Sequence, residues 1–106
     1  GCGAFGAHGL KKMISEEMLA IWHTAVTYQV MHALGMIAVA LLMPRMAGAA
    51  LHWAGRLMLA GIVIFSGSLY LLALTGTRIL GAITPFGGVA FLAAWLLVAW
   101  AALKNR

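Results

Sequence analysis

Charge is scarce in this chain of 106 residues. Only 8% of the residues are Asp, Glu, Lys or Arg, against about 25% in soluble domains, and 64% are hydrophobic. So few charges cannot build a hydrated surface, which excludes a soluble enzyme domain and a disordered tail. The single cysteine, Cys2, can form no internal disulfide, which excludes a disulfide-stapled secreted module. We therefore expect the chain to lie in a lipid bilayer.

Acidic residues are limited to Glu16 and Glu17, and the seven basic residues give a net charge of +5. The basic residues do not cluster, and they lie singly or in pairs between or beside the apolar runs. They are Lys11, Lys12, Arg45, Arg56, Arg78, Lys104 and Arg106. This dispersal is typical of the flanks of membrane helices and not of a nucleic-acid surface. We expect membrane lipids as partners, together with other membrane subunits or further copies of the chain, and no nucleic acid.

Two apolar segments have clear helix boundaries. The first is predicted over 16–43, because Ser15 is a good N-cap, acids occupy the first turn, and Pro44 ends the run. The second is predicted over about 50–74 and closes at Gly76, where glycine can adopt the left-handed conformation. Each exceeds the roughly 20 residues that a bilayer-spanning helix needs.

A third spanning helix is predicted over 85–103, with Thr84 as the capping hydroxyl and Pro85 in the first turn. The chain opens without a methionine in an apolar segment, 1–10, that is too short to span. We expect it to be the remnant of a first membrane helix or of a cleaved signal segment, and its many small residues fit a packed helix better. Short loops make successive helices antiparallel. The predicted fold is all-α: a single domain, 1–106, forming an up-down bundle of four transmembrane helices whose first member is incomplete.

Polar side chains occur where lipid-facing residues are expected to be apolar. Thr24, Tyr28 and His32 follow one another at spacings of four, so they share one face of the 16–43 helix, and Gln29 stands three residues before His32. Unpaired polar groups are costly in hydrocarbon, so this stripe is predicted to face the bundle interior. The full set of candidate polar residues within the membrane is His8, Tyr28, Gln29, His32, Ser66, Ser68, Tyr70 and Thr84.

Two interpretations of these residues stay open: hydrogen bonds that join helices, or a pathway for protons or solutes. Haem held by His8 and His32 is not favoured, because antiparallel helices put His8 nearer His23. Zinc hydrolysis is not favoured either, because Glu16 and Glu17 are accounted for by the helix start. No Asp is present to orient a catalytic histidine. We expect no cofactor, no metal, no catalytic residue and no enzymatic activity.

Short motifs spread along the chain carry a resemblance to a known family. In order they are GAFGAHGLK (3–11), Trp22, TAV (24–26), YQ (28–29), HAL (32–34), GI (61–62), FSGSLY (65–70), LTG (74–76), ITP (83–85), GG (87–88), FL (91–92) and Trp95. Together they resemble the YgdD-like family of small membrane proteins, with small departures at Cys2 and Ala94. The resemblance implies a bacterial inner-membrane protein of four helices, and it implies no activity, because that family is uncharacterised.

Two functions from different classes follow. The first is an accessory or structural subunit that packs within a larger membrane assembly. The alternative is a module that handles protons, small solutes or lipids through the intramembrane polar stripe. Four basic residues lie on the side of the C-terminus and three on the other side, so the positive-inside rule predicts N-in and C-in insertion.

Overall fold

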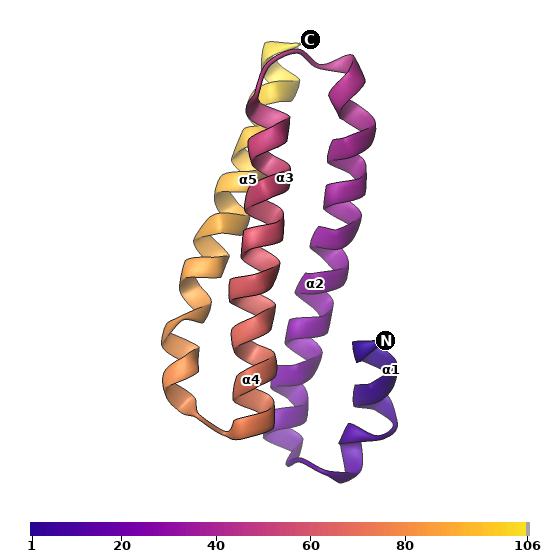
Figure 1. The fold of residues 1–106 in the computed structure, drawn as a ribbon, viewed down its shortest axis with the longest axis vertical. Helices are drawn as coiled ribbons and strands as arrows, with labels where there is room; N and C mark the ends of the chain where they lie inside the picture. Colours follow the sequence, from indigo (N-terminus) through magenta and orange to yellow (C-terminus); the bar gives the residue numbers. More distant parts are fainter. Residues whose placement is uncertain (106) are drawn as a thin grey trace.

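The structure is a computed structural model, and it describes residues 1–105; Arg106 lies outside the described residues. All its regular elements are helical, and residues 1–105 contain no strand. Three helical segments in this range are long and apolar enough to cross a membrane: Glu16–Arg45, Ala50–Thr75 and Arg78–Lys104. They run up, down and up beside one another (Figure 1), which confirms the predicted all-helical up-down bundle. The longest dimension is 49 Å, so the helix ends extend beyond a hydrocarbon core of about 30 Å.

The N-terminal segment folds back along the next helix. A short helix α1 (Cys2–Ala7) and a 3-10 turn η1 (Leu10–Lys12) lead into α2 (Glu16–Leu42), and Figure 1 shows α1 beside the first half of α2. The Ser15 hydroxyl accepts a hydrogen bond from the Met18 N–H at 3.2 Å, which confirms the predicted N-cap. The predicted helix over 16–43 ends at Leu42 in the structure.

The second spanning segment is not one continuous α-helix. It comprises α3 (Ala50–Gly61), a π-helical segment η3 (Ile62–Ser66) and α4 (Gly67–Thr75), where the prediction was an unbroken helix over 50–74. The N–H of the first α4 residue bonds to the carbonyl of the first η3 residue, five positions earlier, which is the π pattern. Gly76 ends the segment with φ of 70°, which confirms the left-handed glycine cap.

Helical turns form both remaining connections. A 3-10 turn η2 (Met43–Arg45) follows α2, and another, η4 (Arg78–Ala82), precedes α5 (Thr84–Lys104). The prediction that Thr84 caps the last helix is wrong, because Ile83 is the N-cap and Thr84 is the first helical residue. The Thr84 hydroxyl is engaged elsewhere, 2.5 Å from the Ser68 hydroxyl.

Two apolar clusters form the core, one at each end of the bundle. The first lies near the connection of α2 to α3 and comprises Val39, Leu51, Ala54, Met58, Ala94 and Ala101. The second, near the turn that joins α1 to α2, comprises Leu10, Trp22 and Ala73. Polar and aromatic residues occupy the middle, where Ser66 and His32 are buried. The candidate site is in this middle layer.

Candidate functional site

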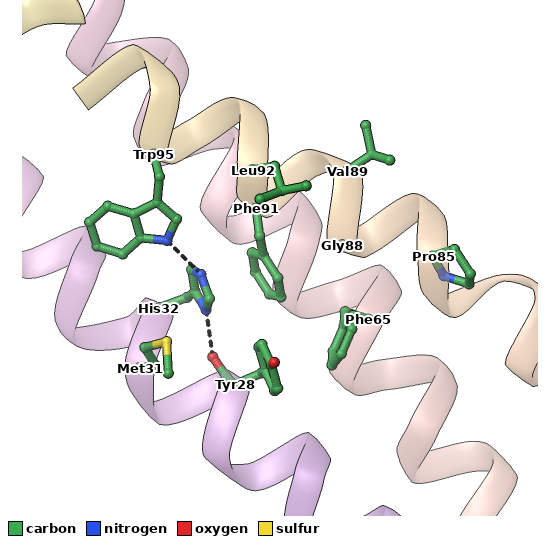
Figure 2. A pocket seen from close by; sticks show the side chains of 10 residues that line it. All are labelled: Tyr28, Met31, His32, Phe65, Pro85, Gly88, Val89, Phe91, Leu92 and Trp95. Carbon is green, nitrogen blue, oxygen red and sulfur yellow. Dashed lines mark hydrogen bonds between the residues drawn. The ribbon is translucent and has the colours of Figure 1, made fainter. Parts of the chain in front are cut away.

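His32 lies at the centre of the middle layer, on α2, with only 2% of its surface exposed. The Trp95 Nε1–H donates a hydrogen bond to His32 Nε2 at 2.9 Å, and His32 Nδ1 lies 2.8 Å from the Tyr28 carbonyl oxygen (Figure 2). An indole N–H can only donate, so Nε2 must accept and Nδ1 must carry the proton that is donated to the carbonyl. Both ring nitrogens are therefore occupied, and this geometry holds a neutral ring in one tautomer.

Aromatic rings fix the position of His32. Its ring stacks on Phe91 of α5, with centroids 3.6 Å apart and planes 10° apart. Phe65 of η3 packs between α2 and α5. Its ring centroid lies 4.5 Å from that of Tyr28 and 5.5 Å from that of Phe91. A side chain on Gly61 would overlap the Phe91 ring, so the absence of a Cβ at this position allows the ring to enter the bundle. The π-helical segment thus borders the site through Phe65.

These rings enclose a groove of about 470 Å³ between α2 and α5. Its lining residues are Tyr28, Met31, His32, Phe65, Pro85, Gly88, Val89, Phe91, Leu92 and Trp95, all drawn in Figure 2. Val89 and Leu92 on the rim are more than 60% exposed, so the groove opens on the outer, lipid-facing side of the bundle. It is a lateral groove and not a channel along the helix axes.

Gln29 points to a different part of the bundle. Its Oε1 accepts a hydrogen bond from the Tyr70 hydroxyl of α4 at 2.5 Å. The Tyr70 ring packs 4.5 Å from the ring of Trp22, whose Nε1–H donates to the Cys2 carbonyl of α1 at 2.9 Å. Gln29 and His32 both find interhelical partners, as predicted for polar groups in a bilayer, but they belong to two separate clusters.

Serine hydroxyls make further interhelical bonds. The Ser66 hydroxyl is buried and donates to the Ala25 carbonyl of α2 at 2.8 Å. The Ser68 hydroxyl lies 2.9 Å from the Phe65 carbonyl oxygen and 2.5 Å from the Thr84 hydroxyl, which also lies 3.4 Å from the Leu80 carbonyl oxygen of η4. This chain of hydroxyls joins α5 to the π-helical segment and satisfies one of its carbonyls.

The prediction that Thr24, Tyr28 and His32 all face the bundle interior is only partly confirmed, because His32 is buried whereas Thr24 and Tyr28 are exposed. His8 is exposed at the C-terminal end of α1, so it does not join the buried polar groups. Thr24 is exposed as well, and its hydroxyl bonds to the Ala20 carbonyl of its own helix at 3.1 Å, so it needs no partner from another helix. His23 and His52 are both exposed.

Sequence reasoning missed the main partners of His32. Phe65, Phe91 and Trp95 belong to the motifs that carry the family resemblance, but none of them was predicted to contact His32. A signal was present, because Gly88, Phe91 and Trp95 recur at spacings of three and four and therefore share one face of α5. Within residues 1–105, no three His, Cys, Asp or Glu side chains lie close enough to hold a metal ion.

Comparisons with known proteins place the chain in a family. Residues 2–88 match the family model described as "Protein of unknown function (DUF423)". The chain is 53% identical over 105 residues to the UPF0382 membrane protein YwdK of Bacillus subtilis, covering 98% of this chain and 85% of that protein. It is 52% identical over 104 residues to a UPF0382 membrane protein of Staphylococcus epidermidis, covering 98% and 84% respectively. No solved structure matches the chain.

These matches agree with the resemblance at its coarser level, that of a small membrane protein from an uncharacterised bacterial family, but none of them carries the YgdD-like name. The names of the relatives and the three spanning-length helices in residues 1–105 agree on an integral membrane protein. The family match covers well over half of the chain, and the relatives are similar over nearly all of it. The chain therefore belongs to the DUF423 family, the family of the UPF0382 membrane proteins.

Proposed function

We propose that this protein is an accessory subunit of a larger membrane assembly, without a catalytic site of its own, and that its polar residues hold its helices together. The observation that carries the proposal is the pairing of His32. A proton relay needs a ring nitrogen that can take a proton from water and pass it on. Both nitrogens of His32 are instead bonded within the bundle, to Trp95 and to the Tyr28 carbonyl.

The other polar side chains support the same role. Within residues 1–105, no fully buried side-chain nitrogen or oxygen lacks a hydrogen-bond partner, so no such atom is left over to line a path through the bundle. Several of the bonds join helices, as in the pairs of Gln29 with Tyr70 and of Ser68 with Thr84. Such bonds stabilise the packing of membrane helices against one another. The outer faces are then left for contacts with lipid and with other subunits.

Capture from native membranes tests the accessory role. The tagged full chain, extracted in mild detergent, should migrate in size analysis as a complex larger than the monomer. A photo-crosslinking residue at Leu34, which is 61% exposed, should label a partner protein, whereas the same residue at Val39, which is 2% exposed, should not. Migration as a lone monomer, with no adduct to another protein from the Leu34 position, would contradict the proposal.

We also propose a bacterial inner-membrane location with the C-terminus in the cytoplasm. Arg45, Arg56 and Lys104 lie toward that end of the bundle and Arg106 follows in sequence, against Lys11, Lys12 and Arg78 at the other end. Positive residues favour the cytoplasmic side. A C-terminal green fluorescent protein should therefore fluoresce, and a C-terminal alkaline phosphatase should be inactive. The opposite pattern would reverse the orientation.

A further inference from the structure

The groove between α2 and α5 contains one polar side-chain group without a protein partner. Three of its lining side chains carry polar atoms: Tyr28, His32 and Trp95. Trp95 donates a hydrogen bond to His32, and the other ring nitrogen of His32 bonds to the Tyr28 carbonyl. The Tyr28 hydroxyl makes no hydrogen bond to any residue within 1–105, and Tyr28 is 36% exposed. A hydrogen-bond donor therefore remains free on the groove wall.

The depth of Tyr28 restricts what can bond to it. At about 1.5 Å per residue, Tyr28 lies about 18 Å along α2 from Glu16, close to the middle of a hydrocarbon core about 30 Å thick. Acyl chains at this depth offer no acceptor, and the ester and phosphate groups of phospholipids lie nearer the surface. An unpaired hydroxyl is unfavourable in hydrocarbon. A fitting occupant therefore dissolves in the bilayer core and brings its own acceptor.

The walls of the groove define the rest of the occupant. The rings of Phe65 and Phe91 lie beside Tyr28, with centroids 4.5 and 6.1 Å from that of Tyr28, and Trp95 lies on the other side of His32 (Figure 2). Aromatic rings pack well against another flat ring. The groove volume of about 470 Å³ falls in the range of about 300–1,000 Å³ that is common for small-molecule sites. It opens toward lipid, from which a hydrophobic compound can enter sideways.

We propose that this groove binds the ring of a lipid-soluble quinone, with the Tyr28 hydroxyl donating a hydrogen bond to a quinone carbonyl. A quinone combines the three required properties, because its ring is flat, its carbonyl accepts a hydrogen bond and it dissolves in the hydrocarbon core. The inference concerns binding alone. It does not rest on the accessory role, since it uses only residues of this chain.

Equilibrium dialysis of the full chain in lipid nanodiscs tests the inference, with empty nanodiscs as background. The probe is duroquinone, whose fully methylated ring has no open position for addition of the Cys2 thiol. The control is durene, the same methylated ring without carbonyls. We expect saturable binding of duroquinone above background and much weaker binding of durene. Equal binding of the two would show a groove that takes any hydrocarbon, and it would overturn the assignment.

Matched variants locate the bond. Tyr28→Phe should weaken duroquinone binding about tenfold, the equivalent of one hydrogen bond. Tyr70→Phe also removes one hydroxyl, but one that is bonded to Gln29 outside the groove, and it should leave the affinity unchanged. Gly88→Leu places a side chain in the groove and should abolish binding, with unfolding curves confirming that each variant is folded. Native affinity in Tyr28→Phe or in folded Gly88→Leu would refute the site.

A second copy of the chain could also cover the groove. Leu92 lines the rim and is 67% exposed, so a cysteine there would meet its equivalent in a dimer sealed across this face. In a Cys2→Ser background, Leu92→Cys should give no disulfide-linked dimer in membranes under mild oxidation. Rapid and complete dimer formation would assign the groove to a protein interface and exclude the quinone.

Discussion

The closest approach between α5 and the second spanning segment is at Gly87. A Cβ placed on Gly87 would overlap the backbone nitrogen of Phe65 and would lie 2.7 Å from its Cβ and 2.8 Å from its Cα. At the next position, a Cβ on Gly88 would meet only Phe65 ring atoms, at 3.9 and 4.0 Å, which is ordinary van der Waals contact. Gly87→Ala and Gly88→Ala make the same chemical change on adjacent residues. Comparing them therefore separates the effect of steric overlap with Phe65 from the effect of replacing a glycine by alanine.

The two variants should change the free energy of unfolding in opposite directions. Replacing a helical glycine by alanine stabilises by about 0.5–1 kcal/mol, because the unfolded chain loses conformational freedom, and this gain applies to both. Overpacking costs about 1–3 kcal/mol, and we expect the upper end for Gly87→Ala because a backbone cannot rotate aside as a side chain can. Gly87→Ala should therefore destabilise by about 2 kcal/mol and Gly88→Ala should stabilise by up to about 1 kcal/mol.

Reversible unfolding in mixed micelles measures this difference. Circular dichroism recorded as the fraction of sodium dodecyl sulfate increases gives the free energy of unfolding of each variant relative to the native chain. A separation of about 3 kcal/mol between the two variants is expected, the sum of the opposite effects. Equal midpoints, or a Gly87→Ala variant more stable than the native chain, would refute the close packing of α5 on η3.

Three further outcomes test contacts inside the bundle. Gln29→Leu removes the acceptor of the Tyr70 hydroxyl and should cost about 1 kcal/mol, with similar coupling in a double-mutant cycle with Tyr70→Phe; additive effects would contradict the bond. Trp95→Phe leaves buried His32 without its donor and should cost about 1–3 kcal/mol in the same unfolding assay, where no loss would argue against the pairing. Proteoliposomes of native and His32→Ala protein should show equal proton leak by a pH-sensitive dye, and a slower leak in the variant would favour a proton path.

The number and type of helices could be predicted because long apolar runs have one stable solution in lipid, in which every backbone group is bonded within its own helix. Local chemistry also located some ends well. The Ser15 hydroxyl caps α2, and Gly76 adopts the left-handed conformation after α4, since both depend on neighbouring residues alone. These features need no knowledge of how the helices pack.

The partners of the polar residues could not be predicted, because inner and outer faces of a membrane helix are both apolar and periodicity does not tell them apart. Thr24 shows the difficulty: its hydroxyl bonds to its own helix, so its polarity carries no information about burial. Thr84 was expected to cap its own helix but bonds to Ser68 across the bundle. The pairing of His32 with Trp95 joins residues 63 positions apart and depends on helix packing.

The π-helical segment Ile62–Ser66 has a consequence for how the second span meets its neighbours. On the N-terminal side of this segment, α3 packs against both α5 and α2, whereas α4 on the other side packs mainly against α2. An α-helix advances about 100° per residue, so a continuous α-helix of the same sequence would turn the faces of α4 by about that angle from their present direction. The π turn absorbs one residue of the sequence within a single turn and so keeps α3 and α4 in phase with the helices around them. Deleting one residue of Ile62–Ser66 would therefore restore a regular helix with both halves still facing their present neighbours.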